Sequence, residues 1–217
     1  MCGIAGILSL DGAADNTGVI DKMTARLAHR GPDGKGSLCR EALTLGHRRL
    51  SIIDIESGAQ PMANEDGQVA VVFNGEIYNY RELTDELRSC GHDFRTRSDC
   101  EVIVHGWEQW GIRCVERFRG MFAFAVADWR QGKLFLARDH LGIKPLFYSF
   151  DRSHLVWGSE IKTVLASGLV KRVLDYNALG EFLSWEYIPG QGTLFTNIKK
   201  LEPGFMIDID LTKPVCE

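Results

Sequence analysis

The second residue of the chain could act as a nucleophile. Removal of Met1 would leave Cys2 with a free α-amine beside its thiol. An α-amine has a pKa of about 7.7–8.0, so near neutral pH it can accept the thiol proton and serve as a base. A cysteine could also stand at this position by chance, and the first six residues leave both interpretations open.

Three further polar groups fall at predicted strand ends or loops, where binding groups commonly lie. Arg49 could hold a carboxylate through two parallel hydrogen bonds, or it could form an ordinary surface ion pair. The side-chain amide of Asn74 and the backbone N–H of Gly75 could both point at one oxyanion. The same dipeptide could instead be a plain Asn-Gly turn.

Acidic residues complete the set. Asp99 could cap a helix, as could Ser98 before it, or it could join Glu76 in holding an ammonium group. A thiol, oxyanion donors, a cation for a carboxylate and acids for an ammonium would together bind an α-amino acid with an acyl side chain. Residue spacing alone does not separate this combination from chance.

The composition is that of an ordinary globular protein. The 217 residues are 45% hydrophobic and 25% charged, with a net charge of −4. This small charge gives no reason to expect a nucleic acid or an anionic membrane as partner. The six cysteines form no Cys-x-x-Cys pair, so no metal ligand is assigned. Without a secretory signal or a long apolar run, a reducing, cytoplasmic setting is expected.

Hydrophobic periodicity indicates the elements that position these groups. The segment 121–128 alternates phenylalanine or valine with alanine, which suits a strand between two layers. The strand that ends at Asn74 is expected to turn there, and Ser98 with Glu101 could form a capping box. Strands are predicted over 4–10, 43–45, 50–53, 69–73, 121–128, 134–137, 146–150, 154–158 and 205–209. Helices are predicted over 16–28, 80–90, 99–110, 160–166 and 176–184. The pattern predicts one α+β domain of paired antiparallel sheets with outer helices.

Nine stretches in order along the chain match one family. They are MCGI (1–4), HRGPD (29–33), RLSIID (49–54), QP (60–61), NGEIYN (74–79), SDCE (98–101), GMFAFA (120–125), RDHLGIKPL (138–146) and SEIK (159–162). The chain resembles the glutamine-hydrolysing domain of class II glutamine amidotransferases, which are N-terminal-nucleophile enzymes. Within the class it is most similar to glutamine-using asparagine synthetases. The resemblance implies a four-layer αββα sandwich of two antiparallel sheets.

The resemblance also assigns roles in the reaction. Cys2 corresponds to the nucleophile, with its own amine as base, and Asn74 and Gly75 correspond to the oxyanion hole. Hydrolysis of L-glutamine would proceed through a thioester on Cys2 and give glutamate and ammonia. This chain is expected to need no metal or cofactor, since ATP and Mg²⁺ would belong to a synthetase domain.

Substrate recognition is carried over in the same way. Arg49, rather than Arg48, corresponds to the group that holds the α-carboxylate, so Arg48 is expected to be a solvated charge. Glu76 and Asp99 correspond to the ammonium contacts. The backbones of two neighbouring residues, Ile52 and Ile53, are expected to help. Arg138 and Asp139 are expected only to support the site from a neighbouring strand.

The sequence departs from the family pattern in one respect. The Ser-Gly-Gly-x-Asp-Ser phosphate loop of the synthetase domain does not occur, so residues 1–217 are expected to be a single glutaminase domain without it. The expected partners are L-glutamine and a synthetase domain or subunit, and the chain could form a homodimer. A catalytically silent regulatory or binding domain is the alternative, particularly if Met1 is retained. An N-terminal-nucleophile amidase for another substrate is a third reading.

Overall fold

The alternation in β6 (Gly120–Asp128) reflects the stacking of two sheets. In the computed structural model, which describes residues 1–12 and 14–212, β6 is central in one sheet. Phe122 and Phe124 point to the layer of helices outside, while Ala123 and Ala125 face the other sheet. The small side chains let the second sheet pack closely, as the sequence predicts.

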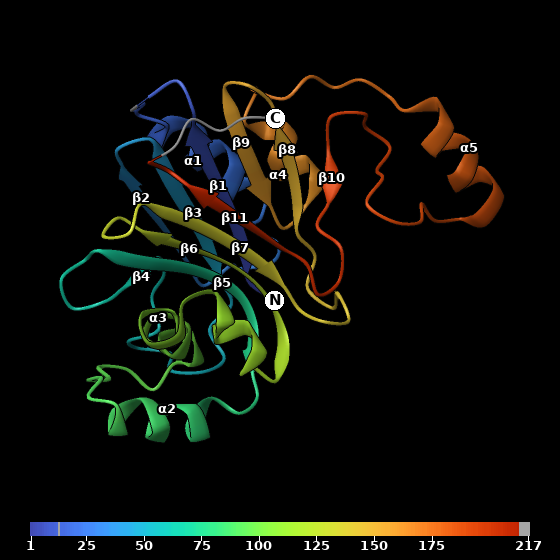
Figure 1. The fold of residues 1–217 in the computed structure, drawn as a ribbon. Coiled ribbons are helices and arrows are strands. Elements are labelled where there is room, and N and C mark those ends of the chain that lie inside the picture. Colours follow the sequence, from blue (N-terminus) through green and yellow to red (C-terminus); the bar gives the residue numbers. More distant parts are fainter. Residues whose placement is uncertain (13, 213–217) are drawn as a thin grey trace.

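Both sheets are antiparallel (Figure 1). The six-stranded sheet has the order β10-β8-β9-β1-β3-β2 and the five-stranded sheet the order β11-β7-β6-β5-β4. The first consists of β1 (Gly3–Ser9), β2 (Gly34–Arg40), β3 (Leu43–Arg49), β8 (Phe147–Phe150), β9 (His154–Gly158) and β10 (Lys199–Lys200). The second consists of β4 (Met62–Ala63), β5 (Val69–Ile77), β6, β7 (Lys133–Arg138) and β11 (Met206–Asp210).

Helices cover both outer faces. The six-stranded sheet packs against α1 (Thr17–Ala25) and α4 (Ile161–Ala166). The five-stranded sheet packs against α2 (Tyr80–Ser89), α3 (Asp99–Trp110) and the 3₁₀ helix Gly111–Glu116. A further helix, α5 (Tyr176–Trp185), stands away from both sheets (Figure 1). The predicted four-layer αββα sandwich is therefore confirmed.

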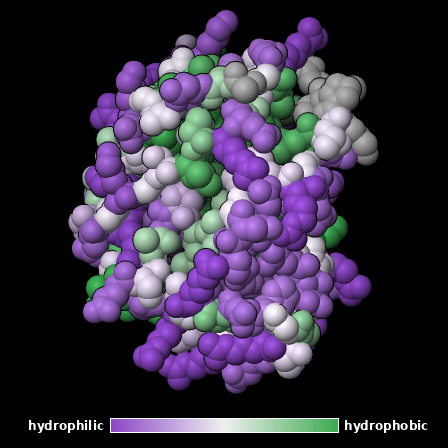
Figure 2. All heavy atoms as spheres, turned by 90° about the vertical axis from the view of Figure 1, so that its left-hand side faces the viewer, coloured by the Kyte–Doolittle hydropathy of each residue, from purple (hydrophilic) through white to green (hydrophobic). Residues whose placement is uncertain are grey.

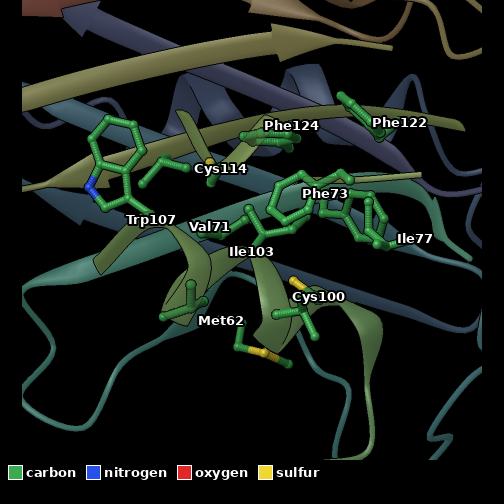
Figure 3. Close-up of a cluster of buried hydrophobic side chains, with 14 of the residues drawn as sticks. Met62, Val71, Phe73, Ile77, Cys100, Ile103, Trp107, Cys114, Phe122 and Phe124 are labelled. Carbon is green, nitrogen blue, oxygen red and sulfur yellow. The ribbon is translucent and has the colours of Figure 1, made fainter. Parts of the chain in front are cut away.

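Three apolar cores join the layers. The core under α3 contains Trp107 and Phe124 (Figure 3), the core between the sheets contains Ala125 and Trp157, and the core under α1 contains Ile20. Burial of each large apolar side chain stabilises the fold by about 1.5–3 kcal/mol, so these cores dominate the packing energy. A Cβ atom on Gly6 would lie 2.0 Å from the Trp157 ring, which is closer than two atoms can pack. This explains why β1 contains a glycine at this position.

Several predicted elements are wrong in detail. β3 is one strand, and residues 50–53 form none, because the Leu50 N–H is directed at the Cys2 sulfur and the Ser51 N–H at Asp33. The sequence patterns also missed β2, β4 and β10, whose segments are short or rich in glycine and charge. Cys216 lies outside the described residues.

Two local motifs also differ from expectation. Asn74 and Gly75 do not turn: β5 continues through both, with Gly75 opposite Phe122 of β6. A Cβ on Gly75 would lie 2.2 Å from the Met121 carbonyl oxygen, so the glycine serves close packing. The capping box is absent, because Glu101 accepts hydrogen bonds from the N–H groups of residues 95 and 96 instead.

None of the helices within residues 1–12 and 14–212 is long and apolar enough to cross a bilayer. The face in Figure 2 is covered mostly by hydrophilic side chains, with smaller hydrophobic areas between them.

Candidate active site

A cavity of about 130 Å³ lies where the start of β1, the end of β3, the later part of β5 and the start of α3 meet. All eight predicted site residues line it: Cys2, Arg49, Ile52, Ile53, Asn74, Gly75, Glu76 and Asp99. Antiparallel pairing accounts for part of this, because Gly3 of β1 lies opposite Arg48 of β3, next to Cys2 and Arg49. The structure thus brings the residues together, and their chemical roles stay predictions.

The Cys2 thiol is partly buried and contacts the backbone of Leu50. The Leu50 N–H donates to Sγ at 3.3 Å, and Sγ lies 3.6 Å from the Leu50 carbonyl oxygen. Burial raises the pKa of the Cys2 thiol, although the Leu50 N–H and nearby positive charge oppose this effect. The thiol is therefore mostly protonated at neutral pH, and a nucleophilic role requires a base.

Side chains from distant segments fix the Cys2 backbone. Arg30 Nε donates to the Cys2 carbonyl oxygen at 2.9 Å, and its Nη1 donates to Glu160 at 3.1 Å. Glu160 also contacts His29 at 2.8 Å and Lys162 at 2.9 Å. This network fixes the position of the Cys2 backbone at the edge of the cavity.

Asn74 presents an unsatisfied amide to the cavity. It is fully buried, and neither Nδ2 nor Oδ1 has a hydrogen-bond partner among the described residues. Such a group costs about 1–3 kcal/mol unless a ligand satisfies it. Its neighbour Phe73 is tied to the other sheet, because His47 Nε2 lies 3.1 Å from the Phe73 carbonyl oxygen. Burial lowers the pKa of His47 to about 4, so the imidazole is neutral near pH 7. Its Nε2–H tautomer can donate a hydrogen bond to that oxygen.

A cage of carbonyl groups holds the Arg49 guanidinium. Nη1 donates to Ile55 at 2.9 Å, and Nη2 donates to Ile53 at 3.3 Å and to Asp54. Gly58 is required beside it, since a Cβ there would lie 2.4 Å from Nη2. These bonds use three of the five guanidinium donors, and the two that remain are the Nε–H and one Nη1–H, which do not lie parallel to each other. Ile52 also lines the cavity and is 65% exposed.

Asp99 is the first residue of α3 and is 5% exposed. Its Oδ2 accepts the backbone N–H of Ile77 at 3.0 Å, while Ser98 is the residue that caps the helix. Burial raises the pKa of Asp99 to about 6, and the nearby charge of Glu76 acts in the same direction. A bound ammonium group would relieve the repulsion between these two carboxylates.

Lys144 is a cavity residue that the sequence analysis missed. It is 5% exposed, and burial lowers the pKa of its amine. The loop that carries it is folded around Asp139, whose carboxylate accepts backbone N–H groups from residues 122, 141, 143 and 144. Arg138 donates to the carbonyl oxygens of Gly142, Lys144 and Leu201. The matched stretch 138–146 was the available signal, and it carried no role for Lys144.

Cys2, which precedes the first strand of the αββα sandwich, lines the same cavity as the buried, unpaired amide of Asn74. The chain belongs to the glutamine amidotransferase domain family, whose model matches residues 1–215. It is 40% identical over 208 residues to glutamine-hydrolyzing asparagine synthetase 3 of Bacillus subtilis (strain 168), covering 94% of this chain and 34% of the relative. It is 45% identical over 166 residues to glutamine-hydrolyzing asparagine synthetase 2 of Arabidopsis thaliana, covering 76% and 28%. The chain thus spans about a third of the length of these relatives.

Solved structures share the fold at low identity. The allosteric regulatory enzyme of purine biosynthesis superposes with a TM-score of 0.70 at 20% identity, over 96% of this chain and 47% of that one. The glutamine phosphoribosylpyrophosphate amidotransferase of B. subtilis superposes with a TM-score of 0.64 at 21% identity, over 77% and 44%. At this level of identity the two similarities show a shared fold.

Proposed function

We propose that this domain hydrolyses L-glutamine to L-glutamate and ammonia through a thioester on Cys2. The observation that carries the proposal is the side-chain amide of Asn74, which is buried and has no hydrogen-bond partner among the described residues, in a residue that lines the same cavity as Cys2. Its donor would be satisfied when negative charge develops on the glutamine amide oxygen. The Gly75 N–H is the second donor that we assign to this oxygen.

The α-amine of Cys2 supplies the base once Met1 is removed. Sγ attacks the side-chain amide carbon of glutamine while the amine accepts the thiol proton, directly or through a water. The amine returns this proton to the departing nitrogen, which leaves as ammonia. A water then attacks the thioester, and glutamate leaves as the thiol is restored. Burial raises the pKa of the Cys2 thiol, so a neighbouring base would assist the attack.

The charged residues of the cavity select a free amino acid. The positive charge of Arg49, whose guanidinium the carbonyl groups of Ile53, Asp54 and Ile55 hold in place, would attract the α-carboxylate, and the donors left free would contact it. Glu76 and Asp99 would hold the α-ammonium, which also explains two carboxylates near one another in a buried place. An amidase for other substrates would have no use for these three charges, and a silent domain is not favoured.

We further propose that a synthetase domain or subunit consumes the ammonia. The named relatives are asparagine synthetases about three times as long as the matched region, so an asparagine-forming acceptor is our first assignment. ATP and Mg²⁺ would act in that domain rather than here. The five described cysteines are free thiols, which suits a reducing, cytoplasmic setting.

The test is ammonia release from glutamine by the purified chain, with mass spectrometry to establish loss of Met1. Cys2→Ala should abolish release and leave the fold intact by circular dichroism. Cys90→Ala is the matched control, because Cys90 is an exposed free thiol at the end of α2. A Cys2→Ala protein that keeps more than a few per cent of the parent activity would remove Cys2 from the mechanism.

A further inference from the structure

A cluster of two imidazoles and a carboxylate lies outside the glutamine cavity, on α3 and the segment after α2. Glu108 Oε2 is 3.1 Å from His105 Nδ1 and 3.8 Å from His92 Nδ1. One ligand atom from each of the three residues lies within 4.8 Å of the others, and the two imidazole centroids are 5.0 Å apart. Two histidines and a carboxylate form a common ligand set for divalent transition metals.

Helix periodicity and burial make this a built cluster. His105 and Glu108 are three residues apart, so both project from the same face of α3. The side chain of His105 is 1% exposed, that of Glu108 13% and that of His92 18%. Long, solvated side chains that meet by accident are much more exposed than these.

Outer contacts orient all three groups. Glu108 Oε1 accepts a hydrogen bond from Asn64 at 2.7 Å, and His92 Nε2 lies 3.0 Å from the side-chain oxygen of Gln109. The second nitrogen of His105, Nε2, is buried without a hydrogen-bond partner among the described residues and lies 3.7 Å from carboxylates of Glu65 and Glu101. Histidine ligands of metals characteristically direct their other nitrogen at a carboxylate or carbonyl oxygen.

The tautomer of His92 in which Nε2–H donates to Gln109 suits a metal ion between His92 and Glu108. When Nε2–H donates to Gln109, the Nδ1 of neutral His92 carries a lone pair directed at the anionic Glu108 oxygen. Lone pair and carboxylate repel each other unless a cation lies between them. A single protonated imidazole would also place a positive charge beside Glu108, so metal binding itself is what the experiment below must measure.

We propose that His92, His105 and Glu108 bind one divalent transition-metal ion of the Zn²⁺ class, with water completing the coordination. The ion joins the segment after α2 to the middle of α3. Asp99, at the start of α3, lies about 9 Å away along the helix axis, so the ion is separate from the glutamine cavity. Its role is structural: it holds α3 in place without taking part in hydrolysis.

Titration of the metal-free Cys2→Ala chain with Zn²⁺ tests this proposal, because that background removes the thiol and α-amine pair as a competing ligand. We expect one Zn²⁺ per chain by calorimetry and elemental analysis, and a higher melting temperature with Zn²⁺. His92→Gln and Glu108→Gln should each weaken binding at least about tenfold, as loss of a ligand requires. Co²⁺ should give the visible absorption of a low-symmetry site in the parent and lose it in both variants.

Cys90→Ser is the matched control, since Cys90 is an exposed thiol two residues before His92. It should bind Zn²⁺ as the parent does. Absence of saturable binding, or binding that His92→Gln and Glu108→Gln leave unchanged, would overturn the site and leave a protonated histidine as the explanation of the cluster. Loss in only one of the two ligand variants would contradict the three-ligand assignment. None of these readouts depends on glutamine hydrolysis.

Discussion

The carboxylate of Asp99 accepts the backbone N–H of Ile77, which ties the start of α3 to the end of β5. This bond holds a negative charge in a buried place beside Glu76, and burial raises the pKa of Asp99 from 3.8 to about 6. The folded state therefore holds the Asp99 proton more tightly than the unfolded state does. The resulting stability is present below pH 3.8 and is lost as the pH rises through about 6.

Asp99→Asn should therefore stabilise the free domain while harming its function. Asparagine can still accept the Ile77 N–H but carries no charge, so the free energy of unfolding at pH 8 should rise by roughly 2–3 kcal/mol, and by less at pH 5. The KM for glutamine should rise because an ammonium contact is lost. Urea unfolding at both pH values and steady-state kinetics test this, with the exposed Asp85→Asn as control. A variant that is less stable than the parent at pH 8 would show that the ionised Asp99 carboxylate does not destabilise the folded state.

Asn74→Ala should lower kcat about 10²-fold with little change in KM, because an oxyanion donor acts mainly in the transition state. Its stability should not fall by the usual cost of a lost hydrogen bond, since the amide has no partner to lose among the described residues. Asn197→Ala, at an exposed position, is the control. A raised KM with unchanged kcat would instead make Asn74 a ground-state contact.

Arg49→Ala should cost about 2–5 kcal/mol in kcat/KM for glutamine, since a buried charge pair loses one partner. Arg49→Lys should recover only part of this, because lysine cannot make the planar fork. The parent should discriminate strongly against glutamine α-methyl ester, and Arg49→Ala should not. The measurement is kcat/KM for both substrates in each variant.

Arg48→Ala is the control for ester discrimination, as Arg48 does not line the cavity. Arg48 is half-buried, and its Nε is buried without a hydrogen-bond partner among residues 1–12 and 14–212, so its side chain is only partly solvated. Arg48→Ala can therefore change stability, yet it should preserve discrimination. If the ester becomes a good substrate only in this variant, the carboxylate lies elsewhere.

Asp139→Asn should destabilise the fold by about 2–4 kcal/mol, because an amide NH₂ would replace one oxygen that accepts buried N–H groups. The loop that carries Lys144 should loosen, and activity should fall with stability. Asp151→Asn is the matched control: this exposed carboxylate also accepts two turn N–H groups, through one oxygen that asparagine retains. Equal urea midpoints for the two variants would contradict the proposed importance of the Asp139 network.

The sequence predicted the sandwich correctly in segments where each residue type occurs in a single environment, such as small side chains between the sheets and large ones under the helices. β6 alternates phenylalanine with alanine, so its two faces were predictable, and the motif at Cys2 placed the cavity at the start of β1. Asn74 and Gly75 misled prediction because their turn propensity is outweighed by pairing with β6. Lys144 was missed because its position depends on the fold of a loop around Asp139.

The His92–His105–Glu108 cluster shows the same limit for contacts between segments. His105 and Glu108 could be paired by helix spacing, but His92 joins them only through the way α2 and α3 pack. No short spacing in the sequence encodes that distance, so the expectation of no metal ligand followed from a search for local motifs alone.

The position of β1 has a consequence for biosynthesis. β1 is synthesised before β9, with which it pairs on one side although β9 lies about 150 residues later, and the carbonyl of the preceding Cys2 is held through Arg30 by Glu160. The proposed nucleophile, Cys2, therefore lacks its final surroundings until β9 and Glu160 have been synthesised. Contacts between such distant residues also slow folding. Glutamine hydrolysis would then begin only on a domain that has closed its sheet, so a half-made chain cannot waste glutamine.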